Sequence, residues 1–331
     1  YKVLIIAPSW VGDMVMAQTL FKVLKSKYGA DLTLDVYANG WAGGLLSRMA
    51  QVNAVIDNPF SHGSFNLLKR IKEGFKLRSS GYNQVFVLPN SFKSAIVPFF
   101  AKISKRTGFI GESRYLMLND IYKLDKQELP LMIDRFCALA NNGRKLSHVS
   151  LPELAIDIAN QKRLYAQFNL DFTKPVIAFC PAAEFGPAKR WPSDYFAQLA
   201  DMVVAKGNQV IILGSAKDTE ISQSIVKLAQ HKVGLIDLCG KTNLTDVIDL
   251  LGGASKVVTN DSGLMHIACA VNVPVVALYG SSSPNFTPPL SSKAHILQIK
   301  LECSPCFQRT CRYGHYNCLK FITPEMVFAK L

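Results

Sequence analysis

The first apolar run of the chain leads directly to an acidic residue. Residues 3–6, Val-Leu-Ile-Ile, have the pattern of a buried strand, and a short turn then opens a helix at Gly12 and Asp13. A dinucleotide-binding protein carries G-x-G-x-x-G at such a junction, where backbone amides hold a pyrophosphate. A carboxylate repels a phosphate, so Asp13 has a role other than phosphate binding. The structural alternative is capping of the helix.

A second polar junction, residues 260–263, follows a later strand-like run and opens the helix that contains His266. Free backbone amides at a helix start form an anion site, and Gly263 allows a ligand to approach them closely. Asp261 is better placed to accept hydrogen bonds from sugar hydroxyls than to bind phosphate. The alternative is a helix capped by Asp261 or Ser262, with a histidine packed beside it.

Two basic residues follow the first strand-like run of the second half. The turn 181–192 contains three prolines and a glycine, and Lys189 and Arg190 bring positive charge to it. Cations aimed at a diphosphate stabilise the negative charge that builds up on a leaving nucleotide. The alternative is a tight turn with two exposed basic side chains.

Two further polar loops also follow strand-like runs. Residues 279–289 contain a glycine and three serines, which are donors suited to phosphate or ribose. Residues 88–100 begin with Asn90 and Ser91 and continue into a helix that carries Lys93, where an anionic acceptor would fit. Helix capping by Ser91 is the alternative.

Half of the eight cysteines crowd into one segment near the end of the chain. They are Cys303, Cys306, Cys311 and Cys318, with His315 among them. In a cytoplasmic chain such crowding points to metal or redox chemistry before disulfides. The intervals of two, four and six residues do not match a zinc ribbon. A structural zinc site, a reduced thiol cluster and a disulfide therefore all remain open.

Short β-branched runs alternate with helical patterns, which is typical of parallel sheets built from βαβ units. The strand-like runs are 2–7, 32–37, 84–88, 176–180, 209–213, 256–259 and 274–279. In the helix that follows the first run, Met14, Ala17, Phe21 and Leu24 share one face, and Gly29 is expected to end the helix.

The plan of the chain then repeats. Residues 176–207 reproduce the order of the first 29 residues: apolar strand, proline, polar turn, amphipathic helix, glycine. We therefore expect an α/β protein of two Rossmann-like domains, 1–165 and 166–331, with a polar linker within 141–174. Their parallel sheets are expected to face each other across a cleft. The last helix is expected to pack back on the N-terminal domain.

The composition is that of a folded protein with excess positive charge. Hydrophobic residues make up 49% of the 331, and 37 basic against 24 acidic residues give a net charge of +13. No apolar run approaches the ~20 residues of a membrane span, and the first residues are not a secretory signal, so we expect a cytoplasmic protein. The charge suits a nucleic acid, an anionic membrane surface or an acidic substrate.

The densest basic segment is 67–78, where Leu68, Ile71 and Phe75 share one helical face. In one interpretation this face packs against the core beneath a solvated basic surface. In the other, the segment rests on anionic lipid headgroups.

Together these segments resemble the heptosyltransferases of lipopolysaccharide inner-core assembly, glycosyltransferase family 9. The matching pieces lie in order between residues 8 and 291: PSWVGDMVMAQTL, LPNSFKSAIVPFFA, RTGFIGESRYLMLND, EFGPAKRWP, GSAKD, NDSGLMHIACA and SSPNFTPPLS. The resemblance implies a GT-B glycosyltransferase with an acceptor-binding N-terminal domain and an ADP-heptose-binding C-terminal domain.

The implied activity is inverting transfer of L-glycero-D-manno-heptose from ADP-heptose to the first heptose of the Kdo-lipid A inner core. No cofactor or catalytic metal is expected. The implied partners are these two substrates and an anionic membrane surface, not a nucleic acid. The implied location is the cytoplasm of a Gram-negative bacterium, peripheral at the inner face of the inner membrane, where basic residues would steer the enzyme to its acceptor.

The resemblance also assigns roles to residues. Asp13 is the catalytic base that takes the proton of the acceptor hydroxyl; a carboxylate at a helix start is a weak base, but it can accept the proton late in bond formation. The donor-binding set is Lys189, Arg190, Asp261, Ser262, Gly263 and His266, with Gly214, Ser215 and Asp218 for the nucleotide pocket. Acceptor contacts are assigned to Asn90, Lys93, Arg106 and Arg114, because the acceptor carries carboxylates and phosphates.

Ala182 departs from the pattern, since a glycine is expected there, and the cysteine-rich tail is not shared by every family member. Three alternatives remain: transfer of the first heptose, a nucleotide-sugar epimerase of the same two-domain plan, and a non-enzymatic basic protein that binds nucleic acid or membrane. A nicotinamide oxidoreductase is disfavoured because neither half carries G-x-G-x-x-G.

Overall fold

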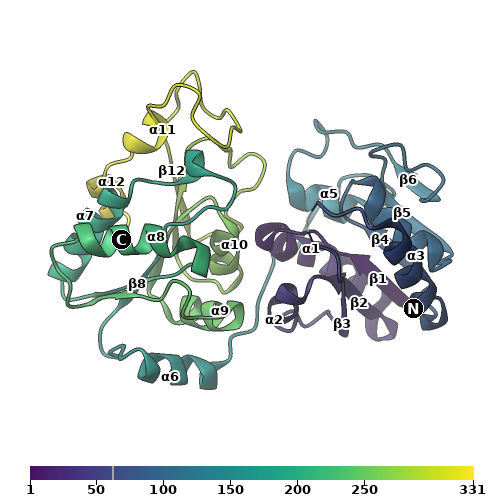
Figure 1. Cartoon of the computed structure of the whole chain (residues 1–331), viewed down its shortest axis with the longest axis horizontal. Coiled ribbons are helices and arrows are strands. Elements are labelled where there is room, and N and C mark those ends of the chain that lie inside the picture. The colour runs from purple at the N-terminus through teal and green to yellow at the C-terminus, as the bar shows by residue number, and fades with distance from the viewer. Residues whose placement is uncertain (62) are drawn as a thin grey trace. The chain divides into compact units, whose positions relative to one another are not determined.

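The computed structural model describes residues 1–61 and 63–331, which form two compact units, Tyr1–Pro152 and Glu153–Leu331. Figure 1 shows the first unit in purple to blue and the second in teal to yellow. Each unit holds one six-stranded, fully parallel sheet with helices packed on it, which is the predicted α/β class with two Rossmann-like halves.

The first unit is built on the sheet β3-β2-β1-β4-β5-β6. Its strands are β1 Lys2–Ile6, β2 Thr33–Ala38, β3 Ala54–Asp57, β4 Gln84–Val87, β5 Lys105–Phe109 and β6 Asp120–Tyr122. Its α-helices are α1 Val11–Tyr28, α2 Gly43–Leu46, α3 Leu67–Lys76, α4 Ile96–Phe100 and α5 Met132–Ala138, and its 3₁₀ helices are η1 Gly29–Asp31, η2 Gly40–Ala42, η3 Leu77–Ser80 and η4 Phe92–Ala95.

The second unit is built on the sheet β12-β11-β10-β7-β8-β9. Its strands are β7 Val176–Cys180, β8 Gln209–Ile212, β9 Leu235–Asp237, β10 Lys256–Asn260, β11 Val275–Tyr279 and β12 Ala294–Gln298. Its helices are α6 Ile158–Gln167, α7 Ser193–Ala205, α8 Thr219–Leu228, α9 Leu244–Gly253, α10 Gly263–Ala270, α11 Asn317–Lys320 and α12 Pro324–Phe328, with η5 Pro187–Lys189 and η6 Ala216–Asp218.

The two sheets have the same connectivity. In each, the first strand is central, the second and third extend to one side, and the fourth to sixth extend to the other. The repeat predicted from the sequence is therefore confirmed at the level of topology. The strand order reverses between β1 and β4 in the first unit and between β7 and β10 in the second. Ligands of such sheets bind beyond the carboxyl ends of the strands at this reversal.

Burial explains why α1 forms where it does. The predicted apolar face, Met14, Ala17, Phe21 and Leu24, is completely buried. Gly29 ends the helix as expected, because its φ of +61° suits glycine and its N–H donates to the Lys25 carbonyl. The short turn between β1 and α1 therefore holds Asp13 near the carboxyl end of the central strand.

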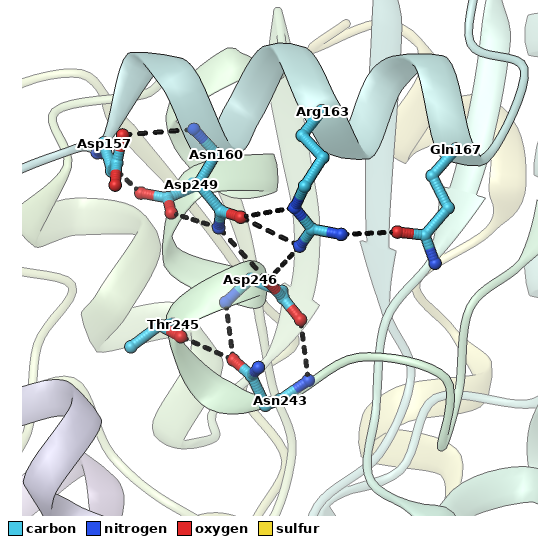
Figure 2. Close-up of polar contacts among 8 residues, drawn as sticks. All are labelled: Asp157, Asn160, Arg163, Gln167, Asn243, Thr245, Asp246 and Asp249. Atoms are coloured by element: carbon cyan, nitrogen blue, oxygen red, sulfur yellow. Dashed lines mark hydrogen bonds and ion pairs between the residues drawn. The ribbon is translucent and has the colours of Figure 1, made fainter.

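The boundary between the units lies at 152/153, whereas the sequence predicted 165/166. The difference is α6, which packs beside α9 of the second unit. Figure 2 shows the polar contacts that fasten it: Asp249 accepts from the Asp157 amide at 2.8 Å and from Asn160 Nδ2 at 2.7 Å. Arg163 reaches Asp246 at 3.1 Å. These carboxylates lie about 85 residues downstream of α6 in the chain, so the local sequence pattern could not reveal the contact.

The last helix also differs from expectation. α12 packs against α7 of its own unit, and Val327 is fully buried in the core that contains Phe196 and Leu199. Among the described helices, none is both long enough and apolar enough to cross a membrane.

Candidate functional site

Asp13 is the third residue of α1, in its first turn, and is partly buried. The residue at the cap position is Trp10, whose indole is a donor only and so cannot satisfy the free amides of the first turn. The alternative, in which Asp13 is the N-cap residue, does not hold, because Asp13 stands three residues beyond the cap position. A carboxylate in the first turn is favoured as the anion by the helix dipole. Asp13 lies close to where the strand order of the first sheet reverses.

The loop after β4 lies on the other side of this reversal and carries Asn90 and Lys93. Asn90 is exposed and Lys93 is partly exposed, so both side chains are open to a ligand. Ser91 holds the cap position of η4, but its side chain makes no capping bond there; the Glu112 carboxylate accepts from the Phe92 amide at 2.7 Å instead. The alternative in which the Ser91 side chain caps this helix therefore does not hold.

Arg114 holds this loop from beneath and cannot reach a ligand. Its side chain is 0% exposed, and its two terminal nitrogens make five hydrogen bonds. The acceptors are the carbonyls of Pro89, Ser91 and Phe109, the Ser94 hydroxyl and the Asn90 side-chain oxygen. Burial lowers the pKa of Arg114 to about 10, which still leaves it charged at neutral pH. The assignment of Arg114 as an acceptor contact is corrected to one of positioning Asn90 and its neighbours.

Arg106 is likewise corrected. It lies near the amino end of β5, at the edge of the sheet opposite to Asn90. Its guanidinium donates to the carbonyls of Met117 at 2.7 Å and Ile103 at 2.6 Å. These contacts tie the segment before β5 to the segment before β6, so Arg106 serves the fold of this region.

In the second unit, Lys189 and Asp261 meet at the corresponding reversal. Lys189 ends η5 in the loop after β7, Asp261 follows β10, and Nζ lies 2.5 Å from Oδ2. The Asn260 amide, fully buried, ties the same two loops together: it donates to the Pro181 carbonyl at 2.6 Å and accepts from the Trp191 amide at 3.1 Å. The loops after β7 and β10 are therefore held together around the ammonium group of Lys189.

The N-terminus of α10 begins directly after this ion pair. Ser262 occupies the cap position, and its hydroxyl makes no bond to the helix amides, so the alternative of a side-chain cap does not hold. Uncapped amides at Gly263 and its successors remain suited to an anion. Asp261 accepts no bond from this turn but faces Lys189 instead.

Three further polar atoms near this end of α10 are buried and lack a hydrogen-bond partner within the described part of the chain. They are Nδ1 of His266 and the hydroxyls of Ser281 and Ser282, which lie in the loop after β11. Burial lowers the pKa of His266 to about 4; Asp261 acts in the opposite direction and Lys189 in the same. Buried polar groups are almost always paired, so unpaired ones beside a cation and a helix start mark a binding site.

The remaining predicted donor residues are partly engaged by the protein itself. Asp218 accepts from both the amide and the hydroxyl of Ser215, which caps η6. Gly214 has no room for a side chain, since a Cβ would lie 2.8 Å from the sulfur of Cys239. Arg190 donates to the Ala183 carbonyl at 3.2 Å and stays partly exposed. Gly214, Ser215 and Asp218 thus shape the loop after β8 through internal contacts.

The cysteine-rich segment contacts the donor loops through its backbone. The Arg309 carbonyl accepts from the Ala188 amide at 3.0 Å, and the Phe307 amide donates to the Ser281 carbonyl at 2.6 Å. All eight cysteines are free thiols. Across residues 1–61 and 63–331, no three His, Cys, Asp or Glu side chains are grouped so that they could hold a metal ion. The imidazole of His315 is used to accept from the Asn317 amide at the start of α11.

Comparison with known proteins decides between the remaining classes. The family model described as glycosyltransferase family 9 (heptosyltransferase) matches residues 70–317. The chain belongs to glycosyltransferase family 9. This family member is 43% identical to lipopolysaccharide heptosyltransferase 2 of Escherichia coli K12, over 100% of the chain and 97% of that protein. It is 44% identical to lipooligosaccharide heptosyltransferase 2 of Haemophilus influenzae, over 99% of the chain and 98% of the relative.

The solved structure of E. coli ADP-heptose lps heptosyltransferase II superposes on this glycosyltransferase with a TM-score of 0.89 at 41% identity, covering 100% of the chain and 97% of that structure. The GT-B class and the enzymatic nature of the protein are thereby confirmed, and the non-enzymatic alternative is excluded.

Sequence reasoning gave no role to Asn260 or Arg309 in this family 9 enzyme, whereas Ser281 and Ser282 belong to the loop 279–289 that it indicated as a phosphate or ribose site. Asn260, Ser281, Ser282 and the backbone of Arg309 build the walls around Lys189 and Asp261. For Asn260 a signal was present, because a buried amide directly before Asp261 interrupts the apolar pattern of β10. Arg309 gave no such signal, since it acts through its carbonyl.

Proposed function

We propose that this glycosyltransferase transfers L-glycero-D-manno-heptose from ADP-heptose to the first heptose of the Kdo-lipid A inner core. The observation that carries the proposal is the full-length identity to lipopolysaccharide heptosyltransferase 2, together with a cation and a free helix start at the expected donor site. The acceptor is assigned to the first unit, at Asn90 and Lys93, and the donor to the second.

In the proposed reaction the acceptor hydroxyl attacks the anomeric carbon of the donor as the bond to the diphosphate breaks. The Asp13 carboxylate takes the hydroxyl proton, and ADP leaves with the electron pair of the broken bond. Because attack and departure occur on opposite faces, the configuration inverts. General base assistance of this kind is worth about 10²–10⁴ in rate.

Charge on the departing diphosphate is proposed to be neutralised by Lys189 and the first amides of α10. A preorganised ammonium and helix start stabilise developing negative charge without reorganising. Asp261 would then exchange part of its contact with Lys189 for the hydroxyls of the sugar. These protein groups supply the charge that the step needs, so no cofactor is invoked, and transfer is expected to persist in EDTA.

We also propose that the enzyme works on the cytoplasmic face of the inner membrane. The acceptor is anchored in a bilayer, and a net charge of +13 favours an anionic surface.

The test is ADP release from ADP-heptose with heptosyl-Kdo-lipid A, run beside Kdo-lipid A without heptose. Release that requires the heptosylated acceptor, and that falls at least a hundredfold in Asp13→Asn, supports the proposal. Asp31→Asn, an exposed carboxylate in η1 of the same unit, is the matched control and is expected to keep full activity. Release with the unheptosylated acceptor would move the enzyme to first-heptose transfer. Conversion of the nucleotide sugar without any acceptor would indicate an epimerase.

A further inference from the structure

Helix α3 turns apolar side chains outward. The sequence pattern allowed Leu68, Ile71 and Phe75 to pack against the core, but Leu68 is 82% exposed and Phe75 is 47% exposed. Phe65, just before the helix, is 50% exposed. The interpretation of this segment as a packed apolar face is therefore wrong for Leu68 and Phe75, whereas Ile71 is half-buried.

The inward face of α3 is made by a glycine and an arginine. A Cβ at Gly74 would lie 2.6 Å from that of Phe100, so glycine alone lets α3 approach α4 this closely. Arg70 is buried and donates to the carbonyls of Phe65 at 2.7 Å and Ser64 at 3.1 Å. Its guanidinium also lies over the Phe60 ring, 4.0 Å from the centroid. These contacts fix the rotation of α3 about its own axis, and this orientation places Leu68 and Phe75 on the outward side of the helix.

Basic side chains surround the exposed apolar ones. Lys69, Lys72, Lys76 and Arg78 are all exposed. Glu73 is the acidic residue of the segment, and it is paired with Lys76 at 2.7 Å. An outward face of leucine and phenylalanine flanked by lysines is the composition of helices that lie in the membrane interface.

Aromatic rings extend this surface beyond the helix. Phe75 lies 6.0 Å from Phe100, and Phe100 lies 5.3 Å from Phe99, which is itself partly exposed. Arg78 covers Phe75 at 4.0 Å. The rings of Phe75, Phe100 and Phe99 thus form a continuous apolar strip, and Arg78 lies beside it.

We propose that the α3 face, defined as Phe65, Leu68, Phe75, Phe99 and the flanking Lys69, Lys72, Lys76 and Arg78, docks on an anionic lipid bilayer. The apolar side chains enter the headgroup region, and the basic side chains bind the anionic headgroups. Two copies of this face would bring like charges together, so its charge disfavours self-association.

This inference rests on the proposed function, because a lipid-anchored acceptor gives the docking its purpose. The structure connects the two: Arg70, from the inner side of α3, also donates to the Lys93 carbonyl at 3.4 Å. Lys93 belongs to the loop proposed to hold the acceptor. A bilayer seated on α3 would therefore lie against the part of the first unit that carries this loop.

The test is binding of the full chain to two kinds of vesicle: phosphatidylcholine alone, and phosphatidylcholine mixed with phosphatidylglycerol. The wild type is expected to bind the mixed vesicles in a salt-sensitive manner and the neutral vesicles weakly. Each basic residue near an anionic surface contributes about fivefold in affinity, so Lys69→Gln with Lys72→Gln should weaken binding about 25-fold. Leu68→Ser with Phe75→Ser should remove stable association with the mixed vesicles.

The matched control is Leu228→Ser with Val233→Ser, two exposed apolar residues of the second unit. This variant is expected to bind vesicles like the wild type. All variants replace exposed side chains, and their thermal unfolding is expected to match that of the wild type. Heptose transfer to a soluble, deacylated acceptor should also be unchanged in the α3 variants, since none of the four replaced residues is assigned to either substrate.

Equal vesicle binding by wild type and α3 variants would overturn the docking surface while leaving the transferase intact. Tighter binding to duplex DNA than to the mixed vesicles at the same salt would also overturn it, as would a dimer that the α3 substitutions dissociate. Vesicle binding that depends on α3 would support the docking surface even if transfer to soluble acceptor failed. In that case the proposed function alone would fall.

Discussion

Lys189 and Asp261 are 72 residues apart in the chain, yet their charged groups lie 2.5 Å apart at the carboxyl ends of two neighbouring strands. The carboxylate side chain is 4% exposed and the lysine side chain 17%. A largely buried ion pair gives little net stability, because desolvation offsets the attraction. We therefore interpret the pair as a means of keeping an ammonium group oriented at the donor site before the diphosphate arrives.

The two partners should respond differently to substitution. Lys189→Ala removes a charge-assisted contact to the diphosphate and should weaken ADP binding tenfold to a hundredfold, measured by isothermal titration calorimetry. Asp261→Asn frees the ammonium, so ADP should bind at least as tightly, while kcat with ADP-heptose falls because the sugar loses an acceptor. Lys174→Ala, which breaks an exposed pair with Asp171, is the control and should change neither quantity. Weaker ADP binding in Asp261→Asn would contradict this account.

His266 predicts how stability depends on pH. Its pKa is lowered by burial to about 4, against about 6.5 in the unfolded chain, so the unfolded state binds the proton more readily between these values. The contribution of neutral His266 is complete above pH 6.5 and is lost as the pH falls toward 4, with a limit of roughly 3 kcal/mol. Urea unfolding from pH 4.5 to 7.5 should show this slope in the wild type. In His266→Gln the free energy of unfolding should change less steeply with pH, by an amount that corresponds to the uptake of up to one proton on unfolding. Identical slopes in the two proteins would show that His266 does not titrate as described.

The elements that could be predicted from the sequence are those whose buried residues recur at regular intervals. The elements fixed by contacts between distant parts of the chain could not be predicted. The buried faces of α1 and the central strands repeat at regular intervals, so the repeated βαβ plan and the loops after the central strands were predictable. The edge strands β3, β6, β9 and β12 and the inner strand β5 were not predicted. Every residue of β3, β6 and β12 is exposed or half-buried, β5 begins with two basic residues, and β9 is only three residues long.

The errors at the site have a common physical cause. Arg106 and Arg114 were selected by charge, but charge does not distinguish a guanidinium that faces a ligand from one that ties backbone carbonyls together. The rotation of α3 was missed for a similar reason. It is set by the close approach at Gly74 and by the carbonyls around Arg70, both of which are contacts made only in the folded chain.

Gly186 tests the role of the cysteine-rich segment. Its φ of +150° is unfavourable for other residues, and a Cβ there would lie 2.5 Å from the Arg309 carbonyl oxygen. Gly186→Ala should therefore cost about 1–3 kcal/mol and push the segment away from the loop that carries Lys189, which weakens ADP binding. Thermal unfolding and calorimetry check both effects. Gly43→Ala, at a helical position with nothing within 4 Å, is the control and should be neutral or slightly stabilising. An unchanged melting temperature in Gly186→Ala would show that the segment does not press on this loop.

Arg114 provides the corresponding test in the first unit. Lysine keeps the charge but offers a point-like ammonium in place of the planar fork, so Arg114→Lys leaves some of the five acceptors unpaired. We expect a loss of about 1–3 kcal/mol in the free energy of unfolding and a higher KM for the acceptor. Binding of ADP should be unchanged, because the donor site is assigned to the second unit. Arg144→Lys, an exposed arginine of the first unit, is the control. If Arg114→Lys weakened ADP binding and acceptor use equally, the effect would be general destabilisation and not the loss of a support for Asn90 and Lys93.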